Sequence, residues 1–95
     1  MDFEWDEDKA RSNETKHGVP FAEAASVFGD PLAVTFDDPR HSADEPRFLT
    51  IGLSTAGRVL IVSHTDRGEA TRIISARVAS RGEREGYEDG DYPRA

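Results

Sequence analysis

The stretch TRIISARVASRGEREGYE, residues 71–88, decides the fold because its pattern changes partway along. Its first half is rich in β-branched and apolar residues, which predicts a strand that ends in "ARVA". Ser80 and Glu83 then have the spacing of a capping box, in which the serine hydroxyl accepts from the amide three residues on and the glutamate reaches back. We therefore expect a strand over ATRIISARVA and a last helix that begins after Ser80.

Three further stretches upstream predict strands. RFLTIGLS (47–54) alternates apolar with small or polar residues, and RVLIVSHT (58–65) is nearly continuous in apolar residues, as a central strand would be. Turns through Gly57 and Gly68 separate the last three strands, and such short connections favour antiparallel hairpins. LAVTF (32–36) supplies a fourth strand.

The N-terminal third predicts two helices. Asp6 is placed to cap a helix over roughly residues 7–17, and Gly18 is placed to end it. VPFAEAASVFGDP then repeats apolar residues at helical spacing, opened by Pro20 and closed by Gly29. FEW (3–5) is short and aromatic, and is read as a possible edge strand.

These elements predict an α+β domain over residues 1–95, with N-terminal helices packed on a four-stranded antiparallel sheet, a C-terminal helix and a flexible tail at 89–95. The chain has no cysteine, which excludes disulfides and thiolate metal sites. Its acidic first residues do not form a signal peptide, and no apolar run has the length to span a membrane. We expect a soluble, cytoplasmic protein.

Arginines gather at the last strand-to-helix junction although the chain is acidic. The formal net charge is −7, yet residues 47–88 hold seven arginines, no lysine and five acidic residues. The planar fork of arginine suits phosphate or carboxylate, and the amides of a helix N-terminus add positive potential. Charge alone leaves two interpretations open: a solvated surface of salt bridges, or an anion-binding junction formed by Arg77, Arg81 and Arg84.

Segments that cover nearly the whole chain, from residue 3 to residue 88, resemble the BrnT family of toxins of bacterial type II toxin–antitoxin pairs. The resemblance is carried by FEWDEDKARSNETKHGVPFAEAASVFGDP, DDPRHSADEPRF, IGLSTAGRVLIVSHTDRG and RIISARVASRGEREGYE. It implies a RelE-like fold, endoribonuclease activity on RNA that inhibits translation, and neutralisation by a ribbon-helix-helix antitoxin of the BrnA type. It also implies that the pair contacts DNA only through the antitoxin.

A second interpretation of the resemblance is a catalytically inactive module that acts only as antitoxin partner and co-repressor. Gly82 and Gly86 stand at positions that are typically basic in the family, and the first half of the chain is acidic. Both features reduce the positive charge of the surface. Because RNA affinity comes mainly from neutralised phosphates, they favour this second interpretation.

Four side chains are candidates for catalysis: Arg77, Arg67, His64 and Tyr87. Without a metal, cations aimed at the charge that develops on the phosphorane supply most of the stabilisation, and Arg77 is preferred because a strand can aim it. Arg67, before Gly68, is either such a cation or a turn residue. The predicted RNA-binding residues are Arg47, Arg72, Arg81 and Arg84. Arg72 and Arg77 are an odd number of residues apart, so without a bulge they lie on opposite faces of a strand.

The remaining candidates have alternative roles. His64 is either an acid or base at the end of a strand or a hydrogen-bonded core histidine. Tyr87 is read as a base-stacking or proton-donating residue, or as an anchor for its helix. His17 complements the dipole of its helix, and His41 lies in an acidic loop. The histidine spacing predicts no metal site, and we expect no cofactor.

Overall fold

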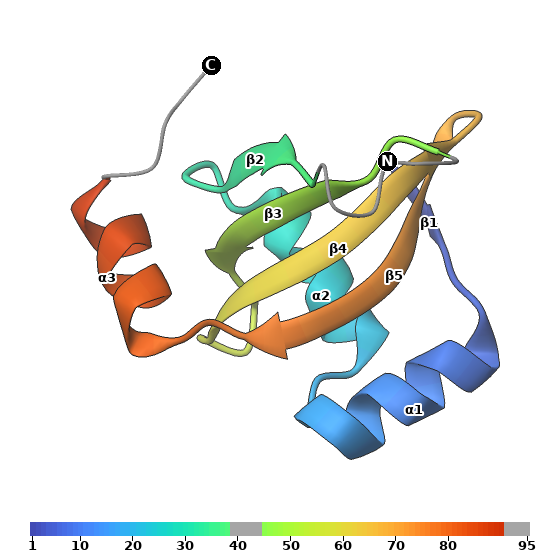
Figure 1. Cartoon of the computed structure of the whole chain (residues 1–95), viewed down its shortest axis with the longest axis horizontal. Helices are drawn as coiled ribbons and strands as arrows, with labels where there is room; N and C mark the ends of the chain where they lie inside the picture. The colour runs from blue at the N-terminus through green and yellow to red at the C-terminus, as the bar shows by residue number, and fades with distance from the viewer. Residues whose placement is uncertain (39–44, 91–95) are drawn as a thin grey trace.

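The core of the fold is a mixed sheet of five strands in the order β1-β5-β4-β3-β2 (Figure 1). The structure is a computed structural model, and it describes residues 1–38 and 45–90. The strands are β1 (Asp2–Glu4), β2 (Val34–Asp37), β3 (Phe48–Leu53), β4 (Val59–Arg67) and β5 (Ala70–Val78). The helices are α1 (Glu7–His17), α2 (Phe21–Ser26), the short 3-10 helix η1 (Val27–Gly29) and α3 (Arg81–Asp89).

The α+β class and the succession of antiparallel pairs from β2 to β5 are confirmed. The expectation of four strands, all antiparallel, is wrong, because the segment read as a possible edge strand forms β1, a fifth strand that pairs in parallel with β5. The pairing joins Glu4 to Arg72, which are far apart in the sequence, so no turn between neighbouring strands indicates it. A segment of three residues is also too short to show a strand period of its own.

The predicted helix limits are confirmed where a cap defines them. The Asp6 side chain accepts from the Lys9 amide at 3.0 Å, and Gly18 adopts the left-handed conformation that ends α1. Ser80 and Glu83 form the predicted capping box of α3. That helix continues to Asp89 and is capped by Gly90, so the predicted tail begins too early. The rest of the tail, and the loop with His41, lie outside the described residues.

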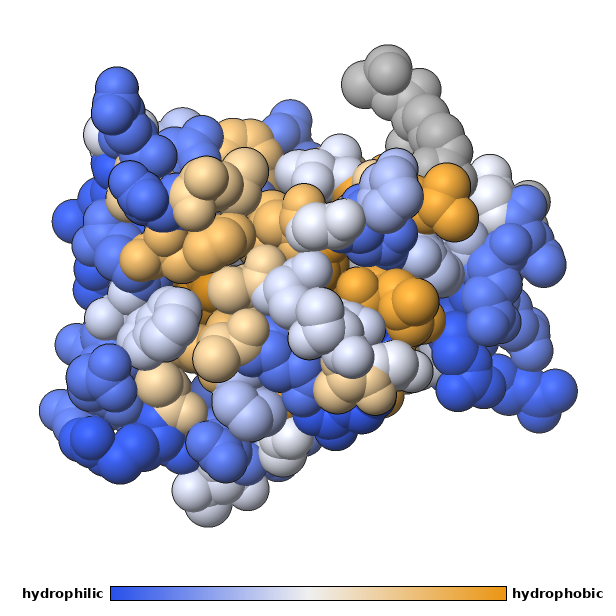
Figure 2. Space-filling model, turned by 180° about the vertical axis from the view of Figure 1, so that it is seen from behind, coloured by the Kyte–Doolittle hydropathy of each residue, from blue (hydrophilic) through white to orange (hydrophobic). Residues whose placement is uncertain are grey.

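Apolar side chains pack on both faces of the sheet. On the face that α2 covers, a cluster combines Phe21, Ala24 and Val27 with strand residues such as Leu60 and Val62. Figure 2 views the molecule from behind and shows apolar atoms across the middle, with hydrophilic atoms along the left, lower and right margins. The close approach of η1 to β3 requires Gly52, because a Cβ there would lie 2.8 Å from Val27 Cγ1.

The opposite face carries a second cluster beneath α3. It is formed by Val34, Ile51, Val59, Ile61 and Ala79, with Tyr87 of α3 packed against it. Helix α3 itself buries no residue. This second face therefore has an apolar end near α3, and its other end carries the residues described next. No helix in residues 1–38 and 45–90 has both the length and the apolar character needed to cross a membrane.

Candidate functional site

A β-bulge in β5 decides which arginines share a face of the sheet. Ser63 pairs with Ser75 but His64 pairs with Ile73, so β5 has one extra residue at this point. Arg72 pairs with Thr65 and Arg77 pairs with Ile61. Thr65 and Ile61 are four residues apart on β4 and so point to one face. Arg72 and Arg77 therefore lie on the same face, the one that bears the α3 cluster.

Two more arginines belong to this face. Arg67 is the last residue of β4, with the parity of Thr65, and a two-residue turn follows it. Arg67 therefore does not lie in the turn itself, which was one of its two alternatives. Arg47 immediately precedes β3 and continues the alternation of Leu49. We call the set Arg47, Arg67, Arg72 and Arg77 the arginine face.

Glutamates from three other parts of the chain pair with this face. Arg72 Nη1 lies 3.0 Å from Glu4 of β1, and Arg67 Nε lies 3.9 Å from Glu45. The Arg77 guanidinium donates two bonds to Glu83, at 2.7 and 2.9 Å. These pairs are partly exposed and contribute little to stability. A phosphate, like a carboxylate, offers two oxygens that an arginine fork can bind together, so it can replace the carboxylates.

Glu83 is the most strongly perturbed carboxyl of the site. The Arg77 guanidinium lowers the pKa of Glu83 to about 2, and hydrogen bonds from the amide and hydroxyl of Ser80 assist it. Its carboxylate is therefore ionised at neutral pH and a weak base. Its oxygens fix Arg77 and cap α3 at the same time. Glu83 thus couples the position of the helix to the orientation of Arg77.

Tyr87 holds α3 against the far end of the same face. Its hydroxyl donates to Asp30 Oδ2, which also accepts from the Leu53 amide at 2.8 Å. Burial raises the pKa of Asp30, but the hydrogen bonds from Leu53, Tyr87 and Leu32 outweigh it and leave that pKa lowered. Asp30 is consequently an ionised acceptor. This geometry matches the anchoring role among the alternatives for Tyr87.

His64 lies on the other face of the sheet, away from the arginines. Its side chain is 5% exposed, its Nε2 is 2.7 Å from the Thr50 hydroxyl, and its ring packs against Phe28 and Phe48. Burial lowers the pKa of His64 and keeps the ring neutral. The structure does not bring His64 together with the arginine face. We therefore leave it out of the proposed site.

The other predicted RNA-binding residues lie on α3 rather than on the sheet. Arg81 is exposed on α3 and pairs with Glu85 at 3.0 Å. Arg84 lines a cleft of about 320 Å³ beside α3, with Leu53, Val59 and Val78 among its walls. The described residues contain no group of three or more His, Cys, Asp or Glu side chains that could hold a metal ion.

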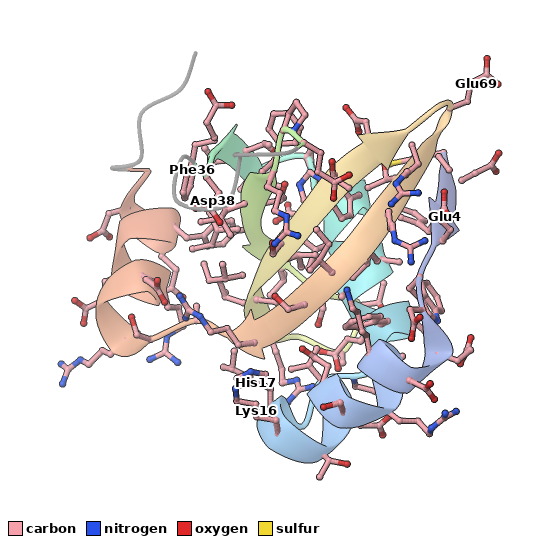
Figure 3. All side chains as sticks on the ribbon, turned by 45° about the vertical axis from the view of Figure 1, so that its right-hand side comes forward. Glu4, Lys16, His17, Phe36, Asp38 and Glu69 are labelled. Carbon is pink, nitrogen blue, oxygen red and sulfur yellow. The ribbon has the colours of Figure 1, made fainter. Side chains whose placement is uncertain are left out.

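Glu4, the partner of Arg72, could not be identified from the sequence. Strand β1 lies at the edge of the sheet beside β5, and Figure 3 shows Glu4 on it. An acidic residue in a short aromatic segment gave the only signal, and the pairing partner is 68 residues away in the sequence. Such a contact becomes visible only once the strand order is known.

Comparisons with known proteins agree with this architecture. The family model described as the ribonuclease toxin BrnT of type II toxin–antitoxin systems matches residues 5–83. The 1.1 Å crystal structure of the Brucella abortus ribonuclease toxin BrnT is similar, with 32% sequence identity and a TM-score of 0.68. The match covers 85% of this chain and 99% of that one. A comparison with curated proteins found no match.

Proposed function

The chain belongs to the BrnT family of ribonuclease toxins of type II toxin–antitoxin systems, and on that premise we propose that it is a metal-independent endoribonuclease that cuts RNA on the arginine face. The observation that carries the proposal is the bulge that places Arg72 and Arg77 on one face of β5. Two guanidinium groups on one rigid strand can hold two phosphates of a single RNA strand.

In the proposed reaction the ribose 2′-hydroxyl attacks the adjacent phosphorus and the bond from phosphorus to the 5′-oxygen breaks. One proton leaves the 2′-oxygen and one is gained by the 5′-oxygen, so the products carry a 2′,3′-cyclic phosphate and a 5′-hydroxyl. Arg77 donates to the equatorial oxygens, where negative charge develops. Its fork replaces the two oxygens of Glu83 with two of the phosphorane.

The other arginines of the face bind the strand on either side of the cut. Arg72 and Arg67 exchange their partners Glu4 and Glu45 for phosphates, and Arg47 contributes from the start of β3. This exchange explains how an acidic chain binds a polyanion, since the attraction is local. Tyr87 keeps α3, and so Glu83, in place through Asp30.

The partner that we propose is a ribbon-helix-helix antitoxin, and contact with DNA occurs only through it. Type II systems pair a protein toxin with a protein antitoxin, which the family match supports for this chain. Translation takes place in the cytoplasm, and we place the activity there.

A second function, an inactive binding module, is favoured by one observation. Arg67, Arg72 and Arg77 are each matched by a glutamate in the absence of RNA. If these glutamates stay paired with the arginines when RNA is present, phosphate cannot bind there. The chain would then keep the antitoxin surface and have no nuclease activity.

The test uses the purified protein, freed of any partner, with labelled single-stranded RNA in EDTA. We expect cleavage with cyclic phosphate ends, and Arg77→Ala lowers the rate by about 10²–10³-fold because one donor to the developing charge is removed. Arg11→Ala is the matched control, since Arg11 is an exposed, ion-paired arginine on α1. Thermal unfolding of both variants checks that neither loses its fold.

Three other results separate the alternatives. Cleavage that EDTA abolishes contradicts the metal-independent mechanism. Equal cleavage rates for the wild-type protein and Arg77→Ala would show that the reaction does not take place on the arginine face. A protein that binds its antitoxin but does not cut RNA, alone or on translating ribosomes, is the inactive module.

A further inference from the structure

A cleft of about 200 Å³ lies between α1 and β5, at the edge of the sheet and outside the proposed active site. Its polar walls come from two lysines, a histidine and two serines: Lys9, Ser12, Lys16, His17 and Ser75. Figure 3 shows Lys16 and His17 at the end of α1, close to β5. The cleft is smaller than the roughly 300–1,000 Å³ of typical small-molecule pockets, which favours a ligand group of the size of a phosphate.

The lysines of this cleft differ from most lysines and arginines in residues 1–38 and 45–90. Six arginines of the described chain form ion pairs within 4 Å, whereas neither Lys9 nor Lys16 forms one with any carboxylate in residues 1–38 and 45–90. The two lysines are seven residues apart on one helix and so share a face. Lys16 complements the negative end of the helix dipole, but Lys9 lies in the first turn, where the dipole disfavours a cation.

The floor of the cleft is fixed by a buried side chain. Asn13 accepts from the Ala76 amide at 3.0 Å and donates to the Ala76 carbonyl at 2.9 Å, as a neighbouring strand would. It also donates to the Val19 carbonyl at 3.0 Å. The lysines therefore project from a helix whose distance to β5 is set in advance. Binding an anion between them costs little reorganisation.

The cleft and the arginine face share strand β5. Ser75 lines the cleft, and Arg77 follows it by two residues on β5, which is about 7 Å along a strand. A distance of this size is spanned by neighbouring phosphates of an extended nucleic acid strand. A strand that places one phosphate on Arg77 thus reaches the cleft with the next.

We propose that the α1–β5 cleft binds the phosphodiester backbone of the single-stranded RNA substrate, beside the bond that is cut. The inference rests on the proposed ribonuclease function and adds a subsite to it. Lys9 and Lys16 neutralise phosphate charge, while the Ser12 and Ser75 hydroxyls and the His17 imidazole are available as hydrogen-bond donors. The contacts are to the backbone, so this subsite reads no base sequence.

The experiment measures binding of a fluorescent single-stranded RNA that carries 2′-O-methyl groups and cannot be cut by 2′-oxygen attack. Affinity is determined over a series of salt concentrations for the wild-type protein, Lys9→Gln, Lys16→Gln and the double variant. Arg11→Gln is the matched control, because it removes one positive charge from the same helix but does not line the cleft. Single-stranded DNA of the same sequence is measured in parallel.

We expect the double variant to bind several-fold more weakly, because two phosphates are no longer neutralised. Its plot of log affinity against log salt should be less steep by about 1.4, since each phosphate of a single strand accounts for about 0.7 of the slope. Arg11→Gln keeps the wild-type slope. The weakening is similar for RNA and DNA, because both present phosphodiesters.

The inference is overturned if the double variant keeps the wild-type slope. If Arg77→Ala nevertheless abolishes cleavage, the ribonuclease function stands and only the subsite is disproved. If the wild-type protein neither binds nor cuts RNA, both the ribonuclease function and the subsite are disproved. A double variant that loses affinity for the antitoxin but not for RNA identifies the cleft as a protein interface instead.

Discussion

Helices α1 and α3 both lie next to β5 or its continuation, but they are attached to the sheet in different ways. Helix α1 is joined by the buried Asn13, which is 6% exposed and forms three hydrogen bonds with backbone groups. Helix α3 buries no residue and is held by partly exposed polar contacts, chiefly Arg77 with Glu83 and Tyr87 with Asp30. One attachment excludes water and the other does not.

This difference has consequences for function. Contacts in a buried amide network break only when the sheet opens, whereas exposed ion pairs exchange readily with other ions. Helix α1 is therefore a fixed wall, suited to hold a backbone in one place. Helix α3 is attached partly through Arg77, which also binds the proposed substrate, so its local stability responds to what occupies the arginine face.

The largest effect is expected where the buried attachment is removed. Asn13→Ala leaves the Ala76 amide and two carbonyls without their partner in the core, so we expect the free energy of unfolding to fall by about 3 kcal/mol. Urea denaturation followed by circular dichroism measures it. The control is Thr15→Ala, an exposed position on the same helix, where a change within about 0.5 kcal/mol is expected. Equal effects of the two variants would contradict the role of Asn13.

A smaller and more local effect is expected at the other helix. Tyr87→Phe removes the hydrogen bond to the ionised Asp30 while the ring stays in the apolar cluster, so a decrease of about 1.5 kcal/mol in the free energy of unfolding is expected. In both the wild-type protein and the variant, hydrogen exchange should be faster in α3 than in β4, because α3 can open locally, and Tyr87→Phe should speed up exchange in α3. Glu85→Ala, which removes only the exposed pair with Arg81, is the matched control. Exchange in α3 that is as slow as in β4 would show that α3 does not open by itself.

The sequence predicted those features whose causes are local. The Ser80–Glu83 capping box and the Asp6 cap depend on residues three apart, and the hairpins depend on turns of a few residues. Predictions from these signals were confirmed. The burial of His64 was among the alternatives, but nothing near it in the sequence decides which face of β4 it occupies.

Features that depend on distant pairing were not predictable. The bulge near Ile73 follows from how two strands fit together, and strand periodicity alone places Arg72 and Arg77 on opposite faces. The parallel pairing of β1 and the cleft between α1 and β5 each join the two ends of the chain. Lys9 and Lys16 consequently looked like ordinary surface lysines of a helix.

The smallest expected effect is on the pH dependence of stability. It distinguishes the attachment of α3 from that of α1 most directly. The Arg77 guanidinium lowers the pKa of Glu83 from 4.5 to about 2, so the ionised carboxylate stabilises the fold above pH 4.5 and this contribution disappears as the pH falls towards 2. Arg77 is 45% exposed, so solvent screening limits the contribution to about 1 kcal/mol or less. Glu83→Gln keeps a capping side chain without the charge. Its deficit in unfolding free energy, measured in urea, should be present at pH 6 and vanish near pH 2.

The corresponding deficit of Asn13→Ala should not change over the same range, because an amide does not titrate. Other carboxyls with lowered pKa values, such as Glu23 and Asp30, destabilise every variant alike in acid, so the comparison uses differences from the wild-type protein. A Glu83→Gln deficit that persists at pH 2 would mean that the deficit does not come from the lost charge. A deficit that vanishes shows that the charge of Arg77 helps to hold α3, the same charge that the proposed reaction directs to the phosphate.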